Sequence, residues 1–303
     1  MRPALILVPL FLSAVPVWST AAGGLVFDPL WTVSQNPGAN AVAHGNERVY
    51  VASGTTLTAL DMASGVSVDE ITVDSGRFAA ITSVAAHGDL VAIALASAVR
   101  TEPGWVQLYH APGGAPVLDL AAEVMVGAGP DMLTFTPDGS RIVVANEGEP
   151  VCTATNEYAI DPEGSISVVD VASRLVQTVT FEALNSSKEE LSARGVRFFG
   201  PNATVAQDLE PEHVTVGPLG LRAWITLQEN NAIAVVDLFR NPPVVSAVLP
   251  LGVKDHGLPE NALDVSDRDG TPGALETYPG LYGMYLPDGI DGALIGGKYY
   301  LFT

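Results

Sequence analysis

The chain has 303 residues, 48% of them hydrophobic, and it carries 34 acidic against 14 basic side chains, a net charge of −20. A chain of this size can bury a large core, and its single cysteine excludes an intrachain disulfide. The acidic surface repels nucleic acid and anionic lipid, so we expect no nucleic-acid partner. The excess of carboxylates suits divalent cations as partners, and the alternative is that it serves only solubility outside the cell.

The N-terminal segment predicts export. Arg2 precedes an apolar stretch over residues 4–18, which is followed by small residues. This layout is typical of a signal peptide, which we predict over residues 1–22. The stretch is short and interrupted by Pro9 and Pro16, so a membrane-spanning helix is the weaker alternative. We therefore expect a mature chain without a transmembrane span that is secreted, periplasmic or attached to the cell surface.

Strand signals recur along the chain in units of one design. Each unit has an approach strand, a polar turn such as Pro137-Asp138-Gly139, an apolar strand, a variable loop and a second strand that often ends in aspartate. The approach strands are expected at residues 41–43, 83–85, 132–135 and 213–216, and the apolar strands at residues 49–52, 90–95, 142–145 and 223–227. Repeats of this kind predict an all-β fold, a β-propeller of three- to four-stranded blades. A β-sandwich is the alternative, but it does not explain the repeat.

One helix is expected outside the strands. Ser187 and Glu190 have the spacing of a capping box, and Leu191 follows them. Residues 297–303 have the pattern of a strand that begins a fifth unit. We therefore predict one propeller domain over residues 23–303, incomplete at its C-terminal side, and expect the chain to be a piece of a longer protein.

Carboxylates gather where the strands end. The strand at residues 142–145 runs into Asn146-Glu147-Gly148-Glu149-Pro150, and the equivalent strand of the fourth unit runs into Gln228-Glu229-Asn230-Asn231. In a propeller such ends meet at the mouth of the central channel. The expected metal ligands there are Asp131, Glu147, Glu149, Asp161, Glu163, Glu210, Glu212 and Glu229. Converging carboxylates raise one another's pKa, and a hard cation such as Ca²⁺ would remove the repulsion. The alternative is an acidic rim in contact with water.

A second acidic cluster lies in residues 264–276. Asp267, Asp269 and Glu276 match positions three, five and twelve of an EF-hand loop, but Val265 occupies position one and flanking helices are not evident. A loop site for a metal that uses Asp267 and Asp269 is one interpretation, and an aspartate-rich turn without metal is the other.

Signatures of nucleophilic catalysis are missing from the sequence, which contains no Gly-x-Ser-x-Gly, no phosphate-binding Gly-rich loop and no His-Glu-x-x-His. Lys254-Asp255-His256 could serve acid–base chemistry or hold a phosphate, although three neighbouring loop residues rarely point at one spot.

Together these segments resemble the choice-of-anchor I family of exported bacterial β-propeller proteins. The resemblance covers roughly residues 25–303 and rests on a series of motifs in order. They are Asp131-Met132-Leu133-Thr134-Phe135-Thr136-Pro137-Asp138-Gly139, Ala145-Asn146-Glu147-Gly148-Glu149-Pro150, Asp161-Pro162-Glu163-Gly164-Ser165, Gly195-Val196-Arg197-Phe198-Phe199-Gly200-Pro201, Ala206-Gln207-Asp208-Leu209-Glu210-Pro211-Glu212, Leu227-Gln228-Glu229-Asn230-Asn231-Ala232, Lys254-Asp255-His256 and Ser266-Asp267-Arg268-Asp269-Gly270.

The resemblance implies a secreted or cell-surface propeller whose acidic loops meet at one face. The same domain is similar to mesenchyme-specific cell-surface glycoproteins linked to calcium carbonate biomineralisation, and some relatives carry alkaline-phosphatase or phytase-like labels. Relatives typically continue past the Tyr299-Tyr300 strand with further blades and a variable anchor.

Two functions are therefore open. The first is an exported, calcium-binding propeller for surface interaction or adhesion, with surface polymers as partners. The second is a metal-dependent phosphoesterase acting on phosphate esters, in which Lys254, His256 or Arg268 assists the bound cations.

Overall fold

The computed structural model describes residues 31–33, 38–112, 118–152, 158–266, 268, 270–271 and 273–303. The expected signal peptide at residues 1–22 and the two candidate ligands Asp267 and Asp269 lie outside the described residues. Within the described ranges, no helix combines the length and the apolar character needed to cross a membrane.

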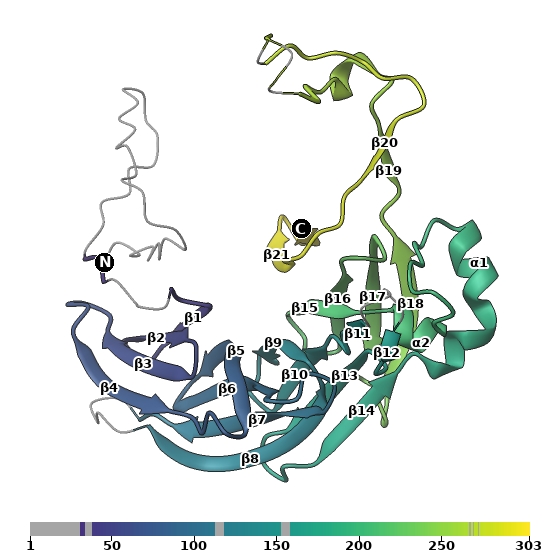
Figure 1. Cartoon of the computed structure of the whole chain (residues 1–303). Coiled ribbons are helices and arrows are strands. Elements are labelled where there is room, and N and C mark those ends of the chain that lie inside the picture. The colour runs from purple at the N-terminus through teal and green to yellow at the C-terminus, as the bar shows by residue number, and fades with distance from the viewer. Residues whose placement is uncertain are drawn as a thin grey trace.

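Four antiparallel sheets of four strands follow one another along the chain, in agreement with the four repeated units (Figure 1). The first contains β1 (Ala41–Gly45), β2 (Arg48–Ser53), β3 (Thr56–Asp61) and β4 (Ser67–Thr72). The second contains β5 (Phe78–His87), β6 (Leu90–Ser97), β7 (Pro103–His110) and β8 (Asp119–Ala128). The third contains β9 (Pro130–Phe135), β10 (Arg141–Asn146), β13 (Ser165–Asp170) and β14 (Val176–Thr180). The fourth contains β15 (Pro211–Val216), β16 (Arg222–Leu227), β17 (Ala232–Asp237) and β18 (Val244–Pro250).

The insertions between these strands carry the short elements. The hairpin of β11 (Val151–Cys152) and β12 (Tyr158–Ile160) lies between β10 and β13, whereas the 3₁₀ helix η1 (Glu182–Ser187), α1 (Lys188–Ala193) and α2 (Val205–Asp208) lie between the third and fourth sheets. The predicted helix is present as α1, but its predicted capping box is wrong because the Ser187 side chain caps nothing. The capping box belongs to α2, where Thr204 and Gln207 bond reciprocally.

The chain after the fourth sheet forms two further hairpins. β19 (Val253–Asp255) pairs with β20 (Tyr282–Met284), and the segment between them, which contains the 3₁₀ helix η2 (Pro259–Asn261), projects away from the sheets (Figure 1). β21 (Asp291–Ile295) pairs with β22 (Lys298–Phe302) and contacts β15. The Tyr299 hydroxyl donates to the Val216 carbonyl at 3.3 Å, which fixes this hairpin against the fourth sheet.

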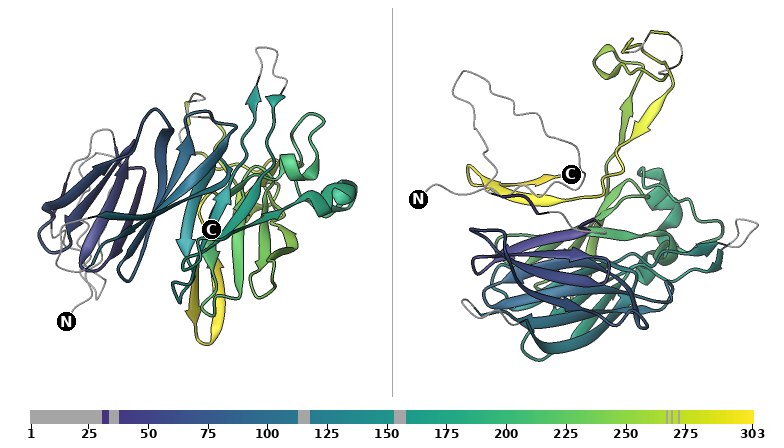
Figure 2. Two further views of the ribbon diagram at one scale, coloured as in Figure 1. Left: turned by 90° about the horizontal axis from the view of Figure 1, so that it is seen from below. Right: turned by 60° about the vertical axis from the view of Figure 1, so that its left-hand side comes forward.

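The hydrophobic core lies between the sheets because the central strands are apolar on both faces. On β10, Ile142 and Val144 pack against the second sheet, and Val143 and Ala145 pack against the fourth. Side chains alternate in direction along a strand, so an uninterrupted apolar run fills two neighbouring cores at once. Figure 2 shows the resulting stack of sheets, each lying face to face with the next. This is the packing of propeller blades.

The first strand of each sheet lies innermost. β1 contacts β5, β5 contacts β9, and β9 contacts β15, so these four strands line a common axis. Each of them pairs antiparallel with the second strand of its own sheet, and Pro130 and Pro211 lie opposite Asn146 and Leu227. The starts of β9 and β15 therefore meet the ends of β10 and β16 at one end of the axis.

Candidate functional site

We call this end of the axis the acidic mouth and define it by Asp131, Glu147, Glu210, Glu212 and Glu229. Asp131 and Glu212 are the second residues of β9 and β15, Glu147 and Glu229 follow β10 and β16, and Glu210 precedes β15. The charges interact across the boundary between the third and fourth sheets, since Glu212 is electrostatically coupled to Glu147, Asp131 and Glu229. The structure thus brings together five of the eight ligands predicted at the strand ends.

A proline precedes the acid at each innermost strand that reaches the mouth. Pro130-Asp131 opens β9, Pro211-Glu212 opens β15, and Pro287-Asp288 comes shortly before β21. Proline has no N–H to donate to a sheet, so it is tolerated at the first residue of a strand. The repeated dipeptide therefore places a carboxylate at the start of β9, at the start of β15 and in the segment before β21.

Burial and mutual repulsion raise the pKa values of three carboxyl groups in the mouth. Burial first, and then Glu147, Asp131 and Glu229, raise the pKa of Glu212 to about 9. Burial with Asp131 and Glu229 raises the pKa of Glu147 to about 7, against a smaller opposing effect of Arg100. Burial with Glu229 and Glu147 raises the pKa of Glu210 to about 8. At neutral pH Glu210 and Glu212 therefore hold protons unless a cation replaces them.

Two glutamates of the mouth are withdrawn from water. The Glu210 side chain is only 4% exposed. Oε2 of Glu229 is fully buried and has no hydrogen-bond partner among the residues that the structure describes. An unpaired buried carboxylate oxygen is costly, so this donor set suits a hard cation, whose ligands are oxygens.

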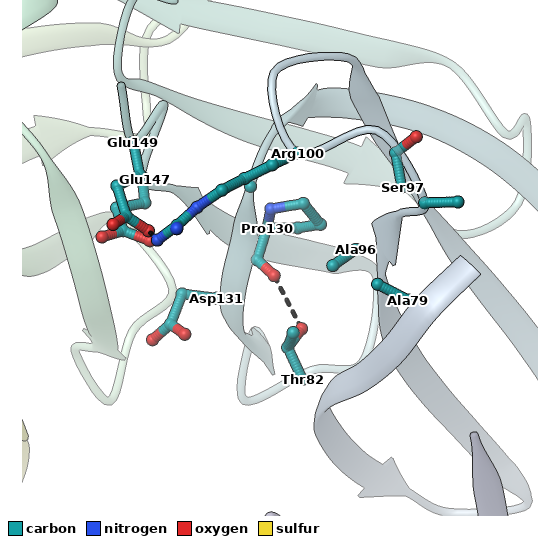
Figure 3. A pocket seen from close by; sticks show the side chains of 11 residues that line it. Ala79, Thr82, Ala96, Ser97, Arg100, Pro130, Asp131, Glu147 and Glu149 are labelled. Atoms are coloured by element: carbon teal, nitrogen blue, oxygen red, sulfur yellow. Dashed lines mark hydrogen bonds and ion pairs between the residues drawn. The ribbon is translucent and has the colours of Figure 1, made fainter. Parts of the chain in front are cut away.

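Glu149 differs from Glu229 because its carboxylate has a charged partner. It forms an ion pair with Arg100, which lies in the loop after β6. Figure 3 shows Arg100 reaching across to Glu149, with Glu147 and Asp131 beside it. These residues border a cavity of about 300 Å³ between the second and third sheets. On its far side the Thr82 hydroxyl donates to the Pro130 carbonyl at 2.6 Å, which fixes the start of β9.

The other predicted ligands lie outside the mouth. Burial and Asp208 raise the pKa of Asp161 to about 6, and Asp161 approaches only Glu210 among the mouth carboxylates. Burial and the Glu182 carboxylate, at the start of η1, raise the pKa of Glu163.

In the Lys254-Asp255-His256 motif, Asp255 and His256 stabilise their own hairpin. The Asp255 carboxylate accepts from the Gly257 amide at 2.8 Å, and the His256 Nδ1 atom lies 2.7 Å from the Asn261 carbonyl. These residues lie on the projecting β19–β20 hairpin, away from the acidic mouth (Figure 1). The arrangement therefore does not favour the phosphoesterase alternative.

Gly148 lets the chain turn between Glu147 of the mouth and Glu149, which pairs with Arg100. Its φ of +72° is unfavourable for other residues, and a Cβ there would lie 2.8 Å from backbone atoms of Glu163 and Gly164. We expect Gly148→Ala to lower the free energy of unfolding by about 2 kcal/mol or more, because both strain and a backbone clash oppose it. Chemical denaturation measures this loss. Gly88→Ala, also at positive φ but in open space, should cost less; an equal cost would contradict the clash.

Three residues of the site were not predicted from the sequence. They are Arg100, His213 and Asp288. Alignment of the proline-acid dipeptides would have found Asp288, and His213 directly follows one of them. Arg100 has no comparable signal, since its loop differs from those of the other units.

The sequence profile of the choice-of-anchor I domain family matches residues 39–303, which is most of the chain. The chain belongs to the choice-of-anchor I family. Membership, together with the stacked sheets, indicates a surface-associated β-propeller. No protein of curated function matches this choice-of-anchor I chain.

Two solved structures are similar at low identity. Hydrazine synthase of Kuenenia stuttgartiensis has 12% identity and a TM-score of 0.37, over 68% of this chain and 66% of that one. The β-propeller domain of Myceliophteria thermophila Cps50 (Swd1) has 10% identity and a TM-score of 0.43, over 66% of this chain and 54% of that one. The choice-of-anchor I chain thus covers less than two thirds of either protein, and similarity at this level does not extend to function.

Proposed function

We propose that this choice-of-anchor I chain belongs to an exported propeller that binds Ca²⁺ at the acidic mouth and uses the ion for attachment to surface polymers. The observation that supports it is the unpaired, buried Oε2 atom of Glu229 among carboxyls whose pKa values burial and mutual repulsion raise. A bound Ca²⁺ would supply the missing partner, and Glu147, Glu212 and Glu229 would be its ligands.

Attachment follows from the charge of the chain. A net charge of −20 repels anionic polysaccharides, whereas a cation held at the mouth could still accept oxygen ligands from such a polymer. We expect the protein to sediment with beads coated by an anionic polysaccharide in Ca²⁺ and to stay in solution in chelator. Retention in both conditions would exclude the calcium bridge.

Calcium binding should release protons. Glu212 and Glu210, with pKa values near 9 and 8, hold protons at pH 7 and must lose them when a cation binds. Calorimetric titration with Ca²⁺ at pH 7, repeated in buffers of different ionisation enthalpy, should report about one to two protons released per ion. Affinity should rise with pH until about pH 9 and then level off. Absence of binding heat would end the proposal, and binding without proton release would move the site away from these glutamates.

A further inference from the structure

His213 introduces a nitrogen atom into the otherwise carboxylate-lined mouth. Its Nδ1 atom lies 3.1 Å from Oδ1 of Asp288 and 3.8 Å from Oδ2 of Asp131. The Glu212 carboxyl hydrogen-bonds Asp131, and one ligand atom from each of Asp131, Glu212 and His213 falls within 4.8 Å of the others. Asp131, Glu212 and His213 thus surround one point, and Asp288 lies beside His213.

The Thr226 hydroxyl holds two of these segments together. The Thr226 side chain is fully buried, its hydroxyl donates to the Asp288 carbonyl at 2.7 Å, and it accepts the His213 amide at 2.9 Å. One hydroxyl therefore sets the distance between the strand that carries His213 and the segment that carries Asp288. The position of His213 beside Asp288 is thus built into the fold.

The distances from His213 Nδ1 to its two aspartates are those of ligands that share a single small divalent ion. Two ligands bound to a tetrahedral Zn²⁺ at ~2.0–2.1 Å lie about 3.3 Å apart. The measured distances of 3.1 and 3.8 Å bracket this value. The Nδ1 atom is buried and makes no hydrogen bond within the described part of the chain, although a carboxylate lies beside it. An imidazole nitrogen is a poor ligand for Ca²⁺ and a good one for Zn²⁺ and related transition metals.

We propose that Asp131, Glu212 and His213 form a site for a borderline divalent metal ion such as Zn²⁺, with His213 Nδ1 as the ligand that selects it over Ca²⁺ and Asp288 held beside His213. This site rests on the proposed cation-binding role of the mouth and adds a nitrogen-dependent specificity to it. The competing interpretation is a protonated His213 that pairs with the two aspartates and binds no metal.

Parallel titrations with Zn²⁺ and Ca²⁺ test the site. We expect His213→Gln to weaken Zn²⁺ binding at least tenfold and to change Ca²⁺ affinity less than threefold, since only the nitrogen ligand is lost. His110→Gln controls for adventitious binding, because His110 is exposed at the end of β7, and it should leave Zn²⁺ affinity unchanged.

The outcomes separate this inference from the calcium proposal. Ca²⁺ binding without Zn²⁺ binding, or equal Zn²⁺ affinity in wild type and His213→Gln, would overturn the zinc site and leave the calcium site standing. Zn²⁺ binding through His213 without Ca²⁺ binding would support the zinc site and overturn the calcium proposal. Absence of both would overturn both.

Thr226 offers a second test that keeps every ligand. Thr226 is a positioning residue, because its hydroxyl holds His213 and Asp288 together. Thr226→Val removes this hydroxyl at nearly constant volume, and Thr226→Ser keeps it. We expect about a tenfold to hundredfold loss of Zn²⁺ affinity in the valine variant only, as for other residues that orient metal ligands. Co²⁺ can replace Zn²⁺ as a visible probe, and its absorption spectrum should change in the valine variant. Identical affinities and spectra in both variants would contradict the positioning role.

Discussion

Replacing Glu212 by glutamine is expected to stabilise the cation-free protein above neutral pH and to abolish its stabilisation by Ca²⁺. The folded state raises the pKa of Glu212 from 4.5 to about 9, through burial and then through Glu147, Asp131 and Glu229. Between pH 4.5 and about pH 9, the Glu212 carboxyl holds a proton in the folded state and has lost it in the unfolded chain. The stability of the wild type must therefore fall as pH rises through this window and level off above pH 9.

Glutamine carries no titrating proton, and its amide can still hydrogen-bond Asp131. Glu212→Gln should thus gain stability relative to the wild type as pH rises from about 5 to 9. One pKa unit corresponds to about 1.4 kcal/mol, and solvent screening reduces the full shift, so we expect a gain of at least about 1.4 kcal/mol at pH 9. Thermal and urea denaturation at pH 6 and pH 9, with chelator or with Ca²⁺, measure both effects.

Glu190→Gln is the matched control, because Glu190 is exposed on α1 and far from any mouth strand in the chain. It should change neither the pH dependence of stability nor the effect of Ca²⁺. Equal pH profiles for Glu212→Gln and wild type would show that Glu212 ionises normally, and the case for a cation at the mouth would lose its electrostatic basis.

Replacing Asn230 by alanine is expected to give one of the largest losses of stability for a polar residue of this chain. Asn230 is fully buried, and its amide donates to the carbonyls of Asp208 and Arg197 at 2.7 and 3.0 Å. Its carbonyl oxygen accepts the Glu210 amide at 3.3 Å. Alanine would leave these backbone groups buried without partners, at about 1–3 kcal/mol each.

We therefore expect Asn230→Ala to lower the free energy of unfolding by roughly 3 kcal/mol or more, as measured by urea denaturation. The same change should weaken Ca²⁺ binding, because Asn230 ties the Glu210 segment to the turn that carries Glu229. Asn40→Ala, at an exposed position, is the control and should cost less than about 0.5 kcal/mol. A small loss in Asn230→Ala would mean that water or a shifted loop satisfies these groups.

Local patterns in the sequence determined the blades and their core. The alternation of Ile142 and Val144 with Val143 and Ala145 is a property of consecutive residues, so it predicts a strand buried on both faces without knowledge of its neighbours. The polar turn at Pro137-Asp138-Gly139 is equally local: Asp138 accepts from Ser140, and Gly139 adopts φ +70°. The family match agrees with this part of the prediction.

Only the tertiary structure decided which carboxylates share one site. Glu163 and Glu212 look alike in sequence, each following a proline, but Glu163 is coupled to Glu182 in an insertion and Glu212 to the mouth. Arg100 neutralises Glu149 because the second and third sheets pack face to face. Such pairings depend on the angle between sheets and on the course of inserted loops. Both are set by packing between residues far apart in the chain, which a local pattern does not encode.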